Sequence, residues 1–188
     1  MNKETIIQGL IDKIGATKYL EIGYGHGTNF NAIKCEHKVA VDPEPAVTDH
    51  DGCIITTSDK FFKTNEAVFD LIFVDGLHHC DQVRKDIINA SKHLSKGGMI
   101  VLHDMCPTSK EMQEVPRTVK QWTGDCWRAM VGFRKKYPDA LSWVHNHDYG
   151  VGVIVPNGRK FTGKFEDNET SYEEFDKDRV TLLGIVND

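Results

Sequence analysis

The stretch YLEIGYGHG, residues 19–27, decides the fold of this chain. Residues 19–22 are typical of a short buried strand, and Gly23, Gly25 and Gly27 then favour a tight turn that lets a ligand approach the backbone. The spacing is Gly-x-Gly-x-Gly, whereas a dinucleotide fold has Gly-x-Gly-x-x-Gly after its first strand. Glu21 suits a cationic amino-acid ligand better than a pyrophosphate. The stretch therefore predicts a ligand-binding turn at the end of the first strand of an α/β sheet.

Apolar runs of strand length recur along the chain and alternate with helix-like segments. The strands expected after the first are residues 38–42, 53–56, 71–75 and 99–102. The expected helices are residues 4–14, which carry apolar side chains on one face, and residues 82–94, closed by Gly97 and Gly98. Apolar strands separated by helices indicate a parallel sheet that is covered on both faces.

The pattern changes after Pro107. Residues 127–136 favour a helix, and the apolar runs 141–144 and 151–155 flank a polar turn. Two strands so close together pair antiparallel, because a parallel crossover needs about a dozen residues or more. We therefore expect a single domain over residues 1–188, with a five-strand α/β sheet ended by one hairpin. The acidic tail from about residue 157 favours a short helix over residues 171–183.

The composition is that of a soluble globular protein, with 39% hydrophobic and 27% charged residues. The net charge of −5 disfavours a protein that grips nucleic acid through phosphates, so we expect a small-molecule partner. No apolar run approaches the ~18 residues of a membrane span, and the first residues lack the order of a signal peptide, so the cytoplasm is the expected compartment. Five scattered cysteines without a CxxC pair indicate reduced thiols. The sequence carries no signal of an oligomeric state.

Acidic residues stand at the ends of the next strands. Asp42 ends the second strand, where an acid in nucleotide folds accepts hydrogen bonds from ribose hydroxyls. Ser58 and Asp59 follow the third strand and are candidates to reach an adenine amino group, although an aspartate before a helix is more often an N-cap. A glycine cluster alone is also compatible with a plain strand-to-helix turn. Its register with Glu21 and Asp42 favours a ligand site.

These residues resemble those of a known protein family. Residues 19–107 resemble the class I methyltransferases that depend on S-adenosylmethionine (SAM). The stretches FDLIFVDGLHH, residues 69–79, and GGMIVLHD, residues 97–104, are similar to a narrower group of small bacterial and phage enzymes related to macrocin-type and catechol-type O-methyltransferases. The resemblance implies a Rossmann-like, doubly wound sheet of about seven strands, mostly parallel with an antiparallel C-terminal hairpin. It also implies a SAM site made of Glu21, Gly23, Tyr24, Gly25, Gly27, Asp42, Ser58, Asp59 and Asp75.

Polar side chains cluster after the fourth and fifth strands, at Asp75, His78, His79, His103 and Asp104. Methyl transfer is a displacement on an activated sulfonium, so the protein has to position the acceptor and remove its proton. Histidine has the side-chain pKa nearest to neutral, which makes His78 or His79 a candidate general base. In the catechol-type relatives the base lies three residues beyond the strand-four aspartate, which selects His78, with Asp75 and Asp104 to orient the acceptor.

The resemblance also implies a metal site. In the metal-using relatives the positions of Asp75, His103 and Asp104 hold magnesium. Imidazole is an unusual magnesium ligand, because magnesium prefers oxygen donors and keeps several waters. Magnesium held by the two aspartates with waters, a softer metal such as manganese, iron or zinc, and no metal therefore stay open. We expect a divalent ion, magnesium or manganese.

The expected reaction is O-methylation of a small-molecule hydroxyl, on a sugar or natural-product-like acceptor. A SAM-binding protein without turnover is one alternative and an N-methyltransferase is another, although the sequence has Asp75-Gly76-Leu77-His78 where base-methylating enzymes have Asn/Asp-Pro-Pro-Tyr/Phe. The glycine spacing disfavours a NAD-type dehydrogenase.

Later residues are candidates for the acceptor pocket: Asp125, Trp127, His145, His147 and Asp148. For Trp127 we favour packing in the core of its helix. Residues 107–124 have poor periodicity, and we expect them to cover the site, because loops of that length are often functional.

Overall fold

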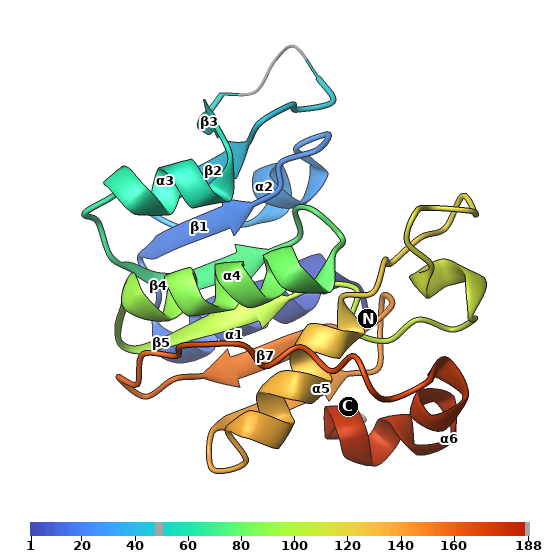
Figure 1. The fold of residues 1–188 in the computed structure, drawn as a ribbon. Helices are drawn as coiled ribbons and strands as arrows, with labels where there is room; N and C mark the ends of the chain where they lie inside the picture. Colours follow the sequence, from blue (N-terminus) through green and yellow to red (C-terminus); the bar gives the residue numbers. More distant parts are fainter. Residues whose placement is uncertain (48–50, 187–188) are drawn as a thin grey trace.

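A computed structural model describes residues 1–47 and 51–186 of the chain. Within these residues eight strands form one sheet, in the order β3-β2-β1-β4-β5-β7-β6-β8, with helices on both faces (Figure 1). The strands are β1 Lys18–Ile22, β2 His37–Asp42, β3 Cys53–Ile55, β4 Phe69–Val74, β5 Leu94–Leu102, β6 Leu141–His145, β7 Val151–Val155 and β8 Ile185–Val186. The helices are α1 Lys3–Ile14, α2 Thr28–Ala32, α3 Ser58–Thr64, α4 Cys80–Lys92, α5 Trp127–Lys136 and α6 Tyr172–Leu183, with a 3₁₀ turn at Glu111–Gln113.

The strand order creates a crevice beside β1. The chain runs outward from β1 to β2 and β3 and then returns to the other side of β1 with β4, and all of these neighbours pair in parallel. The loops that follow β1 and β4 therefore leave the same edge of the sheet in opposite directions, and α/β proteins bind ligands at such a switch point. The expected doubly wound, mostly parallel sheet is confirmed.

The antiparallel hairpin is confirmed as well. β7 pairs antiparallel with both β5 and β6, which places the β6–β7 turn beside the carboxyl end of β5. The sequence pattern missed β8, which pairs parallel with β6. Gly184 ends α6 in a left-handed conformation and turns the chain back to the sheet, and a strand of two residues is too short to leave a pattern.

Gly97 and Gly98 do not close the helix before them, contrary to expectation. α4 ends at Lys92, and both glycines lie inside β5. The pairing of β5 with β4 is irregular between Phe69 and Leu71, and a Cβ on Gly98 would lie 2.8 Å from the Asp70 carbonyl oxygen. The two glycines therefore serve an irregularity in the strand pairing, a common role of glycine within strands.

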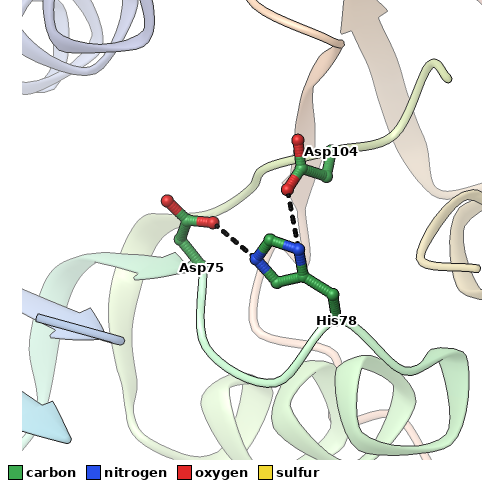
Figure 2. Close-up of side chains that lie close together, drawn as sticks. All are labelled: Asp75, His78 and Asp104. Carbon is green, nitrogen blue, oxygen red and sulfur yellow. Dashed lines mark ion pairs between the residues drawn. The ribbon is translucent and has the colours of Figure 1, made fainter. Parts of the chain in front are cut away.

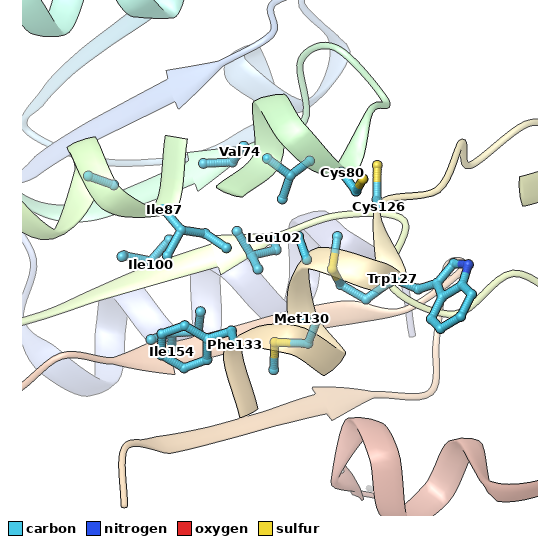
Figure 3. Packing of buried hydrophobic residues seen from close by; sticks show 14 of the residues in the cluster. Val74, Cys80, Ile87, Ile100, Leu102, Cys126, Trp127, Met130, Phe133 and Ile154 are labelled. Atoms are coloured by element: carbon cyan, nitrogen blue, oxygen red, sulfur yellow. The ribbon is translucent and has the colours of Figure 1, made fainter. Parts of the chain in front are cut away.

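Apolar clusters cover both faces of the sheet. α1 buries Ile6, Ile7, Leu10 and Ile11 on one face, as its pattern predicted. On the other face α3, α4, α5 and α6 pack over the sheet, and Figure 3 shows Ile87 of α4 and Phe133 of α5 against strand residues such as Ile100. This packing fixes the ends of β1, β4 and β5 relative to one another.

Two further observations concern the described part of the chain. Among its helices, none combines the length and apolar character needed to cross a lipid bilayer. All five cysteines lie in it and are free thiols, as expected.

Candidate active site

The glycine turn after β1 has the backbone that its sequence predicts. Gly23, Gly25 and Gly27 have φ angles of 95°, 51° and 72°, in the region that favours glycine. A Cβ on Gly23 would overlap the carbonyl oxygen of Asp75, so the ends of β1 and β4 touch through their backbones there. A Cβ on Gly25 would meet none of the described atoms within 4 Å. Gly23 therefore serves the packing of the sheet, and Gly25 borders open space.

Asp42 holds this turn in place. One carboxylate oxygen accepts hydrogen bonds from the backbone N–H groups of Tyr24 and Gly25, at 2.9 and 3.0 Å. The other oxygen accepts from the N–H of Glu44 at 2.8 Å. Each carboxylate oxygen has two lone pairs, so Asp42 keeps acceptor capacity for a ligand while it fixes the loop.

A cavity of about 470 Å³ opens at this edge of the sheet. Its volume lies in the range of small-molecule sites, about 300–1,000 Å³. The predicted residues that line it are Gly23, Gly25, Asp42, Ser58, Asp59 and Asp75. A cavity of about 580 Å³ within the segment after β5, lined by residues such as Met112 and Lys120, shares no lining residue with the first one. We assign the candidate ligand site to the cavity at the glycine turn, because the strand ends converge there.

Three residues of the expected cofactor site lie outside the lining. Glu21 is 1% exposed, and its carboxylate accepts hydrogen bonds from the Tyr19 hydroxyl at 2.5 Å and from the Asn29 amide at 2.6 Å. Burial outweighs these hydrogen bonds and raises the pKa of Glu21 to about 7. The ring of Tyr24 packs beneath Gly27, where a Cβ would overlap it. The Glu21 and Tyr24 side chains thus support the turn from behind, and Gly27 leaves room for the Tyr24 ring.

The far wall of the cavity joins α3 to α4. Thr57, not Asp59, is the N-cap of α3, and its hydroxyl accepts from the Lys60 N–H at 3.3 Å. The Gln82 side chain donates to Ser58 at 3.2 Å and to Asp59 at 3.3 Å. Asp59 is therefore not consumed as a cap, and Gln82 holds both residues at the cavity.

Asp75, His78 and Asp104 come together beside the cavity (Figure 2). The His78 ring lies between the two carboxylates, with Nε2 3.5 Å from Asp75 and Nδ1 3.2 Å from Asp104. Nδ1 also lies 3.2 Å from the carbonyl oxygen of Trp122. Two acceptors facing Nδ1 favour a proton on that nitrogen, which leaves the lone pair of neutral His78 on Nε2.

The backbone after β5 directs Asp104 toward His78. Asp104 has a φ of 63°, a conformation that aspartate tolerates better than most residues. The next residues are pinned to the β6–β7 turn, because the N–H of Met105 donates to the Gly150 carbonyl and the N–H of Cys106 donates to the Tyr149 carbonyl. The antiparallel hairpin therefore fixes the place of Asp104.

His103 and Asp148 complete the cluster, together with Lys3 from the first turn of α1. His103 is 8% exposed, and its Nδ1 lies 3.2 Å from Asp75 and 3.3 Å from Asp104. Its Nε2 has no hydrogen-bond partner among the described residues and lies 3.8 Å from Asp148. Lys3 Nζ lies 2.6 Å from Asp75, and the Lys3 backbone N–H donates to Asp148 at 3.0 Å.

The charges in this cluster support one another. Burial opposes the charge of Asp75, but His103, His78 and Lys3 outweigh it and hold the pKa of Asp75 well below its usual value. Burial likewise opposes the charge of His103 and of His78, but the neighbouring aspartates raise both histidine pKa values, that of His103 strongly. The adjacent His103 is the main cause that lowers the pKa of Asp148 to about 2.

Two of the three expected metal ligands, Asp75 and Asp104, offer atoms that lie within 4.8 Å of one another. Within the described part of the chain, the third residue of this group is His78 and not His103. Nδ1 of His103 faces the two carboxylates as a proton donor. The group of Asp75, His78 and Asp104 contains an imidazole, which magnesium disfavours. Its carboxylate oxygens also already contact basic groups of the chain. The residues present do not fit a magnesium site.

The segment before α5 covers His78, in agreement with the expectation for residues 107–124. The Trp122 ring stacks on the His78 ring, with centroids 5.2 Å apart and an angle of 22° between the planes. Asp125, an expected pocket residue, instead accepts the N–H of Cys80 at 2.7 Å and satisfies the start of α4. Trp127 is fully buried and stacks on Phe175, as expected for a residue that packs in the core.

The sequence carries no signal that Lys3 and Gln82 belong to the site. Lys3 lies 72 positions from Asp75 in the chain, and its helix pattern marks only the apolar face. Gln82 precedes the buried Val83 and carries no motif of its own. Only the fold brings these two side chains to the site.

Comparisons with known proteins agree with the fold. Residues 20–105 match a family model described as a methyltransferase domain. The search of curated proteins found no match to this sequence. Among solved structures, the O-methyltransferase from Bacillus cereus in complex with SAH, the demethylated form of SAM, is 15% identical, with a TM-score of 0.55 over 81% of this chain and 80% of that chain.

Two more solved structures are similar. The SAH-bound methyltransferase PaMTH1 from Podospora anserina is 19% identical, with a TM-score of 0.60 over 81% of this chain and 77% of that chain. The O-methyltransferase TomG from Streptomyces achromogenes, involved in tomaymycin synthesis and in complex with SAM, is 15% identical, with a TM-score of 0.57 over 81% and 78%. Residues 20–105 thus match a methyltransferase domain model, and the chain shares the fold of these SAM- and SAH-bound methyltransferase structures.

Proposed function

We propose that this protein transfers the methyl group of SAM to a hydroxyl of a small molecule, with a sugar or natural-product-like compound as the acceptor. The observation that carries the proposal is the position of Asp75. This residue lines the cavity at the glycine turn and also contacts His78. A methyl donor in the cavity and a base at the cluster would therefore meet at one carboxylate.

The cavity suits SAM on its own residues. Gly25 borders open space, so the turn leaves room for a ligand against the backbone. Asp42 offers a carboxylate to the ribose hydroxyls, and Ser58 and Asp59 offer polar atoms to an adenine at the far wall. When bound, SAM supplies an activated methyl group, so the chain has only to align the acceptor and take its proton.

His78 is the proposed base. Asp104 and the Trp122 carbonyl hold the proton of neutral His78 on Nδ1, and Nε2 then faces Asp75 and is the atom that accepts the acceptor proton. Asp104 also stabilises the imidazolium that forms, as a carboxylate does beside a catalytic histidine. Oxygen is the favoured acceptor atom, because a hydroxyl needs such a base more than an amine does.

The test uses SAM with a labelled methyl group and an extract of small metabolites. We expect labelled products whose methyl group is bound to oxygen, as identified by mass spectrometry, and we expect His78→Asn to bind SAM but to form no product. Asp81→Asn, on the exposed face of α4, is the matched control and should keep the activity. Label found on nitrogen would indicate an N-methyltransferase, and SAM binding without any labelled product would indicate a binding protein.

A further inference from the structure

Lys3 occupies a place that helix stability does not explain. It lies in the first turn of α1, where a cation is unfavourable because the helix dipole is positive at that end. Its side chain is 20% exposed and reaches Asp75 at 2.6 Å, and the ammonium also lies 5.8 Å from the centre of the Phe73 ring. Lys3 at this position therefore serves the ion pair with Asp75.

His103 joins the carboxylates from the other side. Its Nδ1 lies at nearly equal distances from Asp75 and Asp104, 3.2 and 3.3 Å, and so donates between them. The second carboxylate oxygen of Asp104 lies 3.2 Å from His78. Both oxygens of each aspartate thus already face a basic group of the chain.

A divalent ion shared by Asp75 and Asp104 would have to displace these contacts. Magnesium takes oxygen ligands and keeps several waters around it, whereas here an ammonium and two imidazoles approach the same oxygens. Lys3 and His103 also already stand beside the carboxylates of Asp75 and Asp104 that an added cation would neutralise.

We propose that Lys3, with His103, takes the place of the divalent ion in this site, so that methyl transfer needs no metal. Lys3 is a positioning residue: it holds Asp75 at the junction of the cavity and His78. The proposal rests on the proposed function for the reaction that it serves. The inference about metal binding stands on the geometry of Lys3, His103 and the aspartates.

The first test measures Mn²⁺ binding by electron paramagnetic resonance, without substrate or SAM. Wild-type protein is expected to bind Mn²⁺ only weakly, and Lys3→Met, which frees Asp75, to bind it at least about tenfold more tightly. Lys3→Arg keeps the charge and should behave as wild type, and Lys13→Met, on the exposed face of α1, is the matched control. Thermal unfolding of each variant shows that it is folded. Equal Mn²⁺ affinity in wild type and Lys3→Met overturns the proposal.

The second test measures turnover. A chelator should leave wild-type methyl transfer unchanged, and Lys3→Met should lower kcat by about 100-fold with SAM affinity retained, as a displaced catalytic group does. Lys3→Arg should restore most of kcat. Loss of wild-type activity on chelation overturns the proposal. If neither the wild-type protein nor any variant binds SAM, the proposed function is refuted instead. The comparison of Mn²⁺ affinities still decides the role of Lys3.

Discussion

Asp86 makes the stability of this protein depend on pH in a way that one substitution can isolate. The residue lies on α4 behind the cavity, is 1% exposed and accepts a hydrogen bond from Gln82 at 3.2 Å. Burial is the largest influence on it and outweighs the hydrogen bonds from Ser58 and Gln82, so that its pKa rises from 3.8 to about 7. An acid with a raised pKa stabilises the fold fully below its unfolded pKa and loses that contribution as the pH rises through its folded pKa.

The size of the effect follows from this shift. Between about pH 5.5 and pH 8 the unfolded chain keeps Asp86 ionised, while the folded protein changes from the neutral to the charged form, which lowers the free energy of unfolding by about 2 kcal/mol. Glu21, with a pKa of about 7, adds a loss of similar size and the same sign. We expect Asp86→Asn to remove about half of the loss caused by these two acids, because the amide keeps the shape of the side chain and cannot ionise.

Urea unfolding followed by circular dichroism at the two pH values measures this difference. Comparison of wild type with Asp86→Asn isolates Asp86, because the histidines titrate in both proteins. Asp81→Asn, an exposed change on the same helix, should leave the pH dependence as it is in wild type. If Asp86→Asn loses as much stability as wild type between the two pH values, burial does not raise the pKa of Asp86 as stated here.

Three other predictions concern the turn, the tail and the covering segment. Gly25→Ala should cost about 1 kcal/mol of unfolding free energy, from its positive φ alone, and should weaken SAM binding in calorimetry. Gly23→Ala should destabilise the fold far more, because its Cβ overlaps a carbonyl. Equal losses of unfolding free energy in urea would contradict this difference. Ser171→Ala removes the capping box of α6 and should cost about 1 kcal/mol in the same assay; an unchanged midpoint would count against it. Trp122→Ala should keep SAM affinity and lower kcat, because the ring stacks on His78. A kcat equal to that of wild type would show that the stacking does not contribute to catalysis.

The parts of the fold that could be predicted are those with local signals. The glycine turn, the buried strands and the hairpin depend on residue type and spacing within short windows, and all of them lie where the sequence predicts. The fate of Gly97 and Gly98 was missed, because two glycines end a helix or interrupt a strand with the same local pattern, and only the pairing of β5 with β4 decides between them.

The site likewise has residues that local sequence signals predict and residues that only the packing of the fold brings together. Asp75, His78 and Asp104 follow predictable strand ends, so their meeting could be foreseen from parallel topology. The roles of Lys3 and His103 could not, because they depend on how α1 and the β6–β7 turn pack against those ends. The burial of Glu21 was hidden for a similar reason: its partner Asn29 lies on α2, outside the motif.

The proposed reaction depends on SAM binding in the cavity at the glycine turn, which isothermal titration calorimetry of the wild-type protein measures. We expect saturable binding of one SAM per chain, unchanged by a chelator, and no heat with NAD. Absence of binding with SAM, or binding of NAD in its place, would contradict this expectation.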